Sequence, residues 1–190
     1  MINPIWRHYL LVMPIVITLV GNPTELSARP ASVFIPHLER IQRNLPVGLA
    51  MRLPGQLRLG NALDIDETKL IVQVFPSETP PSLTVSLFTC DRNPYPCLVG
   101  SFSVVPTSTQ SARRDLQRHQ DLGDRITLTP YVQGYLLEGP LQNPSYSFST
   151  VMWQQNEMIY TVSFPAIERQ NILLMALSMA QEQPLYRRVN

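Results

Sequence analysis

Charged residues are scarce in this chain. Asp, Glu, Lys and Arg make up 15% of its 190 residues, and the formal net charge is only +1. An average soluble protein is charged at about a quarter of its positions. A chain with so little net charge has no strong field to attract nucleic acid or an anionic membrane. The composition therefore argues against nucleic-acid binding.

Residues that commonly perform chemistry are also few. The chain has two cysteines and three histidines, and no nucleophile-elbow, phosphate-loop or zinc-protease motif occurs in it. Its one carboxylate cluster, Asp64, Asp66 and Glu67, lacks the glycine and the distal glutamate of a calcium loop, so we interpret it as a solvated turn. The sequence therefore predicts no metal site and no cofactor.

Long apolar runs are absent except near the N-terminus. Residues 1–28 have the layout of a secretory signal, with basic Arg7 and His8, an apolar run over 9–20 and the small residue Ala28 for cleavage. This run is shorter than the roughly 20 residues that cross a bilayer, although an uncleaved anchor remains open and would be the one membrane contact. We expect export to a periplasm, a thylakoid lumen or the extracellular space, where disulfides persist.

The rest of the chain predicts one α+β domain over 32–184, followed by a tail at 185–190. The 18 prolines indicate many short loops. Apolar residues at helical spacing predict a helix over 34–44, and a wide apolar arc predicts a terminal helix over 167–183. Between them we expect an antiparallel meander, with one polar helix inserted near 108–120 and the terminal helix covering the sheet.

Cys90 and Cys97 flank a six-residue turn between two segments of alternating character, 83–89 and 98–105. Placing the two cysteines opposite each other sorts both segments into one apolar and one polar face. The apolar face then consists of Leu83, Val85, Leu87, Leu98, Gly100, Phe102 and Val104. This agreement predicts a Cys90–Cys97 disulfide that holds the tip of a hairpin.

A second hairpin, 145–153 with 158–164, brings Trp153 and Tyr160 onto one apolar face. We interpret both as packing residues, with a ligand platform as the alternative. Leu174 interrupts the polar stripe of the terminal helix. Trp153, Tyr160 and Leu174 are therefore the predicted residues of any ligand or partner surface.

A run of strands followed by a closing helix covers about 50 to 60 residues of the C-terminal part, at 134–139, 151–153, 159–162 and 177–180. This pattern resembles the DUF4367-like extracytoplasmic domain of bacterial anti-sigma-factor and sensor proteins. The signal and the Arg-rich and Gln-rich usage are also similar to hypothetical exported proteins of cyanobacteria. Either resemblance implies a binding or sensing domain rather than an enzyme.

We therefore expect an exported, non-catalytic binding, sensing or assembly domain with an apolar surface for a small apolar ligand or a protein partner. The alternative is a small extracytoplasmic hydrolase that uses His119 or scattered carboxylates, because convergence of such groups in space is invisible in a sequence. A cleft with converging titratable groups would favour the hydrolase, whereas an apolar hollow without them would favour binding.

Overall fold

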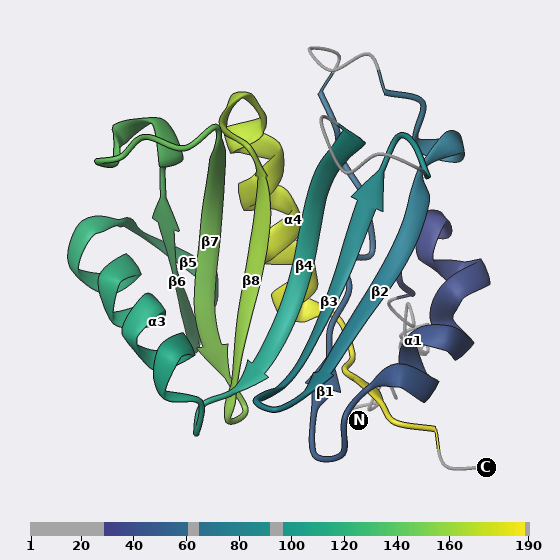
Figure 1. The fold of residues 1–190 in the computed structure, drawn as a ribbon. Coiled ribbons are helices and arrows are strands. Elements are labelled where there is room, and N and C mark those ends of the chain that lie inside the picture. The colour runs from purple at the N-terminus through teal and green to yellow at the C-terminus, as the bar shows by residue number, and fades with distance from the viewer. Residues whose placement is uncertain (1–28, 61–64, 92–96, 189–190) are drawn as a thin grey trace, which may run out of the picture.

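The computed structural model describes residues 29–60, 65–91 and 97–188, so the signal predicted at 1–28 lies outside it. Its centre is an antiparallel sheet of seven strands in the order β2-β3-β4-β8-β7-β6-β5, which confirms the α+β class (Figure 1). The strands are β2 (Ile71–Glu78), β3 (Pro81–Phe88), β4 (Leu98–Pro106), β5 (Asp124–Thr129), β6 (Val132–Leu137), β7 (Phe148–Gln155) and β8 (Met158–Pro165). In the part of the chain that is described, no helix is long and apolar enough to cross a membrane.

The sheet is built from two meanders rather than one continuous meander. The first is β2-β3-β4 and the second is β5-β6-β7-β8, and they join where β4 pairs with β8. The connection between them is the predicted polar helix, α3 (Gln110–Leu122), after which the chain returns at the far edge of the sheet as β5 (Figure 1). Alternation along a strand assigns its faces but not its neighbours, so the sequence could not predict this strand order.

The face of the sheet opposite α3 carries the main core. It is covered by the 3-10 turn η1 (Ser32–His37), by α1 (Leu38–Asn44) and by α4 (Arg169–Gln181), which follows the short turn η5 (Ala166–Glu168). Phe34 of η1 meets Phe102 of β4 edge to face at 5.6 Å. Because both α1 and α4 bury their apolar residues here, the predicted N-terminal and terminal helices are confirmed.

The predicted tail begins inside the fold. Leu185 and Tyr186 form a short strand, β9 (Leu185–Tyr186), which pairs with β1 (Ala50–Met51). The carbonyl of Ala50 also accepts a hydrogen bond of 2.7 Å from the hydroxyl of Tyr160. These pairings tie the segment after α4 to the core, so the domain extends beyond position 184.

The disulfide hairpin has the predicted register over most of its length. Cys90 and Cys97 are bonded, with their Cα atoms 5.5 Å apart. An irregularity after Leu87 pairs Phe88 with Leu98, which turns Leu98 outward to 38% exposure and buries its neighbour Val99. The prediction that Leu98 faces the core was therefore wrong, because a β-bulge shifts alternation by one residue.

The second hairpin provides the largest buried side chains. Trp153 pairs with Tyr160, and their rings stack with centroids 5.4 Å apart. A two-residue turn, Asn156 and Glu157 with φ of 50° and 62°, joins the strands in the form that suits their twist. Trp153 and Tyr160 have no exposed area, which confirms the packing interpretation and leaves neither ring to form a surface.

Replacing Trp153 by alanine should therefore lower the free energy of unfolding by about 3–5 kcal/mol, because it empties a fully enclosed site. Denaturant unfolding followed by circular dichroism measures this loss. Tyr131→Ala is the control, since Tyr131 is 96% exposed and its removal should change stability by less than about 0.5 kcal/mol. Equal midpoints for the two variants would show that the Trp153 ring is not core.

Candidate functional site

Helix α3 attaches to the sheet through few residues. Ala112 and Leu116 pack against Met152 of β7 and Ile159 of β8, on the face opposite the main core. The third buried residue of the helix is His119. A helix with so narrow an apolar stripe depends on polar contacts as well for its position.

His119 supplies such a contact, because both of its ring nitrogens are engaged. Nδ1 lies 2.8 Å from the carbonyl oxygen of Asp115, and Nε2 lies 2.6 Å from Oγ1 of Thr150 on β7. A carbonyl only accepts, so Nδ1 carries the hydrogen and the Thr150 hydroxyl donates to Nε2. Burial lowers the pKa of His119, which keeps the ring neutral at pH 7, although Asp115 opposes the shift. The neutral imidazole thus links α3 to the sheet.

Two adjoining hollows open beside this link. One of about 390 Å³ lies between the end of α3, the start of β5 and the turn η4 (Gly139–Leu141), and the other, of about 260 Å³, opens over His119 and Thr150. Arg118 and Gln142 line both hollows, and Nη2 of Arg118 donates to Oε1 of Gln142 at 2.9 Å. Together these hollows form what we term the α3 groove, defined by Arg118, Leu122, Leu137, Leu141, Gln142 and Tyr146.

The rim of the α3 groove is apolar and open to solvent. Leu122 is 67% exposed, Leu141 is 81% exposed and Tyr146 is 50% exposed. Single exposed apolar residues are ordinary on a protein surface. Three around two adjoining hollows are typical of a contact surface.

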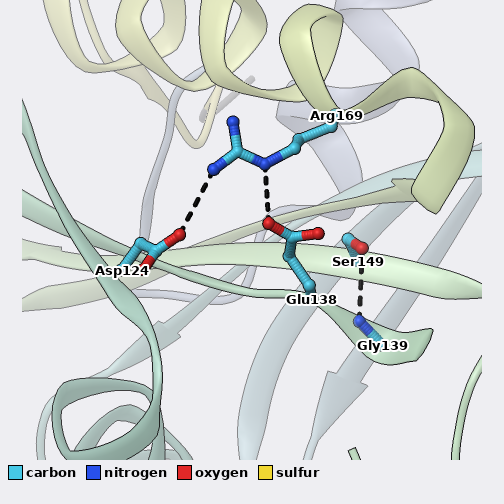
Figure 2. Close-up of polar contacts among 5 residues, drawn as sticks. All are labelled: Asp124, Glu138, Gly139, Ser149 and Arg169. Atoms are coloured by element: carbon cyan, nitrogen blue, oxygen red, sulfur yellow. Dashed lines mark hydrogen bonds and ion pairs between the residues drawn. The ribbon is translucent and has the colours of Figure 1, made fainter. Parts of the chain in front are cut away.

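The two carboxylates of the larger hollow share a single arginine. Arg169, at the start of α4, reaches Glu138 at 2.6 Å and Asp124 at 3.2 Å, as Figure 2 shows. The hydrogen bond to Glu138 raises the pKa of Arg169. Next to it, the amide of Gly139 donates to Oγ of Ser149 at 3.2 Å. These contacts fix the end of β6 and the entry into η4, which forms one wall of the groove.

Other candidate sites hold no converging chemistry. Asp66 accepts hydrogen bonds from Thr68 and pairs with Lys69 at 3.1 Å, which confirms a solvated turn at that position, while Asp64 lies outside the described residues. A further hollow of about 710 Å³ is lined by His37 among other residues, and no ion pair of the described residues joins two of the side chains that line it. Across the described ranges, no three His, Cys, Asp or Glu side chains gather as a metal site.

The predicted surface residues do not meet in the structure. Leu174 is half-buried on α4, whereas Trp153 and Tyr160 are enclosed in the core, so the three form no common accessible surface. The sequence also missed Leu141 and Tyr146. The sequence signal for these two residues is that they are large and apolar but lie in a loop that contains proline and asparagine. Loops run over the protein surface, so apolar side chains there are candidates for a contact surface.

Comparison with protein-family models, with curated proteins and with solved structures found no match to this chain. The resemblance to the DUF4367-like domain therefore stays a prediction. What the α3 groove binds has to follow from its own geometry.

The His119 link should make stability depend on pH. In the folded chain the pKa of His119 lies below the ordinary histidine value of 6.5, so its contribution to stability is complete above about pH 6.5 and is lost as the pH falls. Between pH 7.5 and 5, the free energy of unfolding should decrease more for the natural chain than for His119→Gln, which cannot titrate. The pKa of His37 is lowered as well, so His37→Gln should also reduce the loss of stability, and the double variant should reduce it further than either single variant. Parallel pH profiles for the natural chain and His119→Gln would contradict the assignment.

Proposed function

We propose that this chain is an exported, non-catalytic binding or assembly domain that holds a protein partner in the α3 groove. The observation that supports this most is the gathering of Leu122, Leu141 and Tyr146, all half or more exposed, around two hollows with a hydrogen-bonding pair between them. Large apolar side chains that are exposed close together are typical of a protein contact surface. A sensing role would use the same surface.

A protein segment fits the α3 groove better than a small molecule does. Sites for small ligands enclose about 70–90% of the ligand surface. Here Leu141 keeps 81% of its own area open to solvent, so it stands beside the hollow as a rim rather than as a wall. A partner that covered Leu122 and Leu141 would gain apolar burial, while an apolar molecule in the hollow alone would remain largely wet.

Export is supported by the signal-like pattern of residues 1–28 and by the disulfide between Cys90 and Cys97. Disulfides persist in oxidising compartments and are rare in the cytosol. Whether the signal is removed or retained as an anchor follows from the mass of the protein isolated from its native host.

A hydrolase is the second candidate, and one contact favours it. A hydroxyl that donates to a neutral imidazole, as Thr150 does to His119, is also the arrangement that activates a nucleophile. Against this, His119 is only 7% exposed and its second nitrogen is held by a backbone carbonyl rather than by a carboxylate. Asp124 and Glu138 are both engaged by Arg169. The pair is better explained as the attachment of α3 to β7.

Site-specific photo-crosslinking in the native host tests the binding proposal. Benzoylphenylalanine in place of Leu141 should give an adduct of discrete mass, because that position stands at the rim of the groove. The matched controls are position 131, whose tyrosine is 96% exposed at the opposite end of β6, and position 177 on α4, whose leucine is 36% exposed. Adducts of equal yield at all three positions, or none at 141, would contradict the proposal.

A further inference from the structure

We propose that residues 52–60 form a strap along α4 that opens as a unit, and that the buried carboxyl of Glu182 makes this opening depend on pH. The strap shares no residue with the α3 groove, so it is a second feature of the molecule that does not depend on the proposed function. The contacts that hold the strap, and the polar groups buried beneath it, support the proposal.

The strap is held at separate points, because it contains no helix or strand. At the end of α4, the amide of Gly55 donates to Oγ of Ser178 at 2.9 Å. Just before the start of α4, Oε2 of Glu168 accepts from the amide of Gly60 at 2.6 Å. The strap therefore runs along the helix between these two bonds. A segment without a ladder of backbone hydrogen bonds opens locally more easily than a strand inside a sheet.

The polar groups under the strap are incompletely satisfied. Among the described residues, the buried side-chain atoms without a hydrogen-bond partner are Nε of Arg52, Oε1 of Glu168 and Oε2 of Glu182. All three residues contact the strap or belong to it, and each is more than nine-tenths buried. A buried polar atom without a partner favours any state in which water reaches it. Opening of the strap is such a state.

Two glycines bring the backbone of the strap directly onto the two carboxyl groups. A Cβ added at Gly55 would lie 2.2 Å from Oε1 of Glu182, and one added at Gly60 would lie 2.9 Å from Oε1 of Glu168. Both distances are shorter than a carbon–oxygen contact allows. The closed strap therefore covers the carboxyl of Glu182 at a point where no side chain could stand between them.

This cover determines how Glu182 titrates. Burial raises the pKa of Glu182, although the guanidinium of Arg52 opposes the rise. In the open strap the carboxyl is hydrated, so its pKa returns towards the ordinary value of 4.5. A carboxyl whose pKa is higher in the closed form favours closure at low pH, and this preference is lost as the pH rises through that pKa. Opening therefore becomes more frequent as the pH rises above 4.5.

The groups on the inner side of the strap do not compete with this titration. Arg52 donates to the backbone carbonyl of Glu182, and no ion pair of the described residues joins their side chains. Arg52 and Tyr186 also act on the hydroxyl of Tyr160, whose pKa burial raises above its ordinary value of 10. Arginine and Tyr160 thus keep their charge states between pH 5 and 7.5.

The histidines respond to pH in the opposite direction. The hollow of about 710 Å³ beside the strap is lined by Arg58 of the strap itself and by His37 and Glu67. Burial lowers the pKa of His37, as it does that of His119, so both histidines weaken the fold as the pH falls. Opening of the strap increases as the pH rises, which distinguishes it from unfolding of the whole chain.

Amide hydrogen exchange of the full chain at pH 5 and pH 7.5, corrected for intrinsic exchange rates, tests the proposal. We expect residues 52–60 to exchange through an opening that leaves β8 protected, and their protection to fall by at least about threefold at the higher pH. Glu182→Gln keeps the shape of the side chain but cannot ionise, so it should remove this pH dependence. Glu78→Gln is the matched control, because Glu78 is an exposed glutamate outside the strap, and it should retain the dependence.

Ser178→Ala separates the attachment of the strap from its titration. This change removes the acceptor of the Gly55 amide, so exchange at 52–60 should become faster by the same factor at both pH values. Protection of 52–60 equal to that of β8 at both pH values would overturn the opening. A pH dependence that persists unchanged in Glu182→Gln would overturn the role of Glu182.

Discussion

The constraint on which the structure depends is that both faces of the hairpin β7–β8 are buried. Trp153 and Tyr160 face the main core, while Met152 and Ile159, which alternate with them along the same strands, face the other way. An apolar side chain facing outward from a central strand must be covered, since its exposure forfeits the free energy of burial. The sheet therefore needs helices on both sides, and α3 is the cover of the second side (Figure 1).

The contact between α3 and the sheet is small, and the candidate site lies at the edge of this contact. Helix α3 contributes Ala112 and Leu116 to the contact, and a polar link through His119 and Thr150 completes it. Leu122, the last residue of α3, lies beyond this attachment and is exposed, and the larger hollow lies between it and the segment around η4. Arg169 at the start of α4 contacts Asp124, the first residue of β5, and Glu138, which follows β6 (Figure 2). These contacts hold the η4 side of the groove in place. The result is a groove whose base is held by these contacts and whose apolar rim is open to solvent.

The sequence predicted what local periodicity controls. The helices, both hairpins, the disulfide and the stacking of Trp153 on Tyr160 all follow from alternation and spacing along neighbouring segments. It could not predict the pairing of β4 with β8, because the order of strands depends on contacts between segments far apart in the chain. The bulge that turns Leu98 outward was invisible for a similar reason, since one inserted residue leaves no compositional trace.

The candidate site was predictable only in part. His119 was named as a candidate residue, but its partner Thr150 lies 31 positions away and is brought near by the packing of α3 on β7. Trp153 and Tyr160 lie in the core rather than on the expected surface with Leu174. A wide apolar face occurs on deeply buried elements as well as on elements that bind a partner, so the sequence pattern does not separate the two. The groove depends on where α3 ends relative to a loop, which is a property of the assembled fold.

Amide hydrogen exchange tests the central claim, that partners dock between the end of α3 and the segment around η4. The full chain would be measured alone and with a peptide selected for binding to it. We expect slower exchange at 115–122 and 137–148, which form the two walls of the α3 groove, and no change at 169–181 in α4. Protection confined to α4, with the two groove segments unchanged, would contradict this account of the protein.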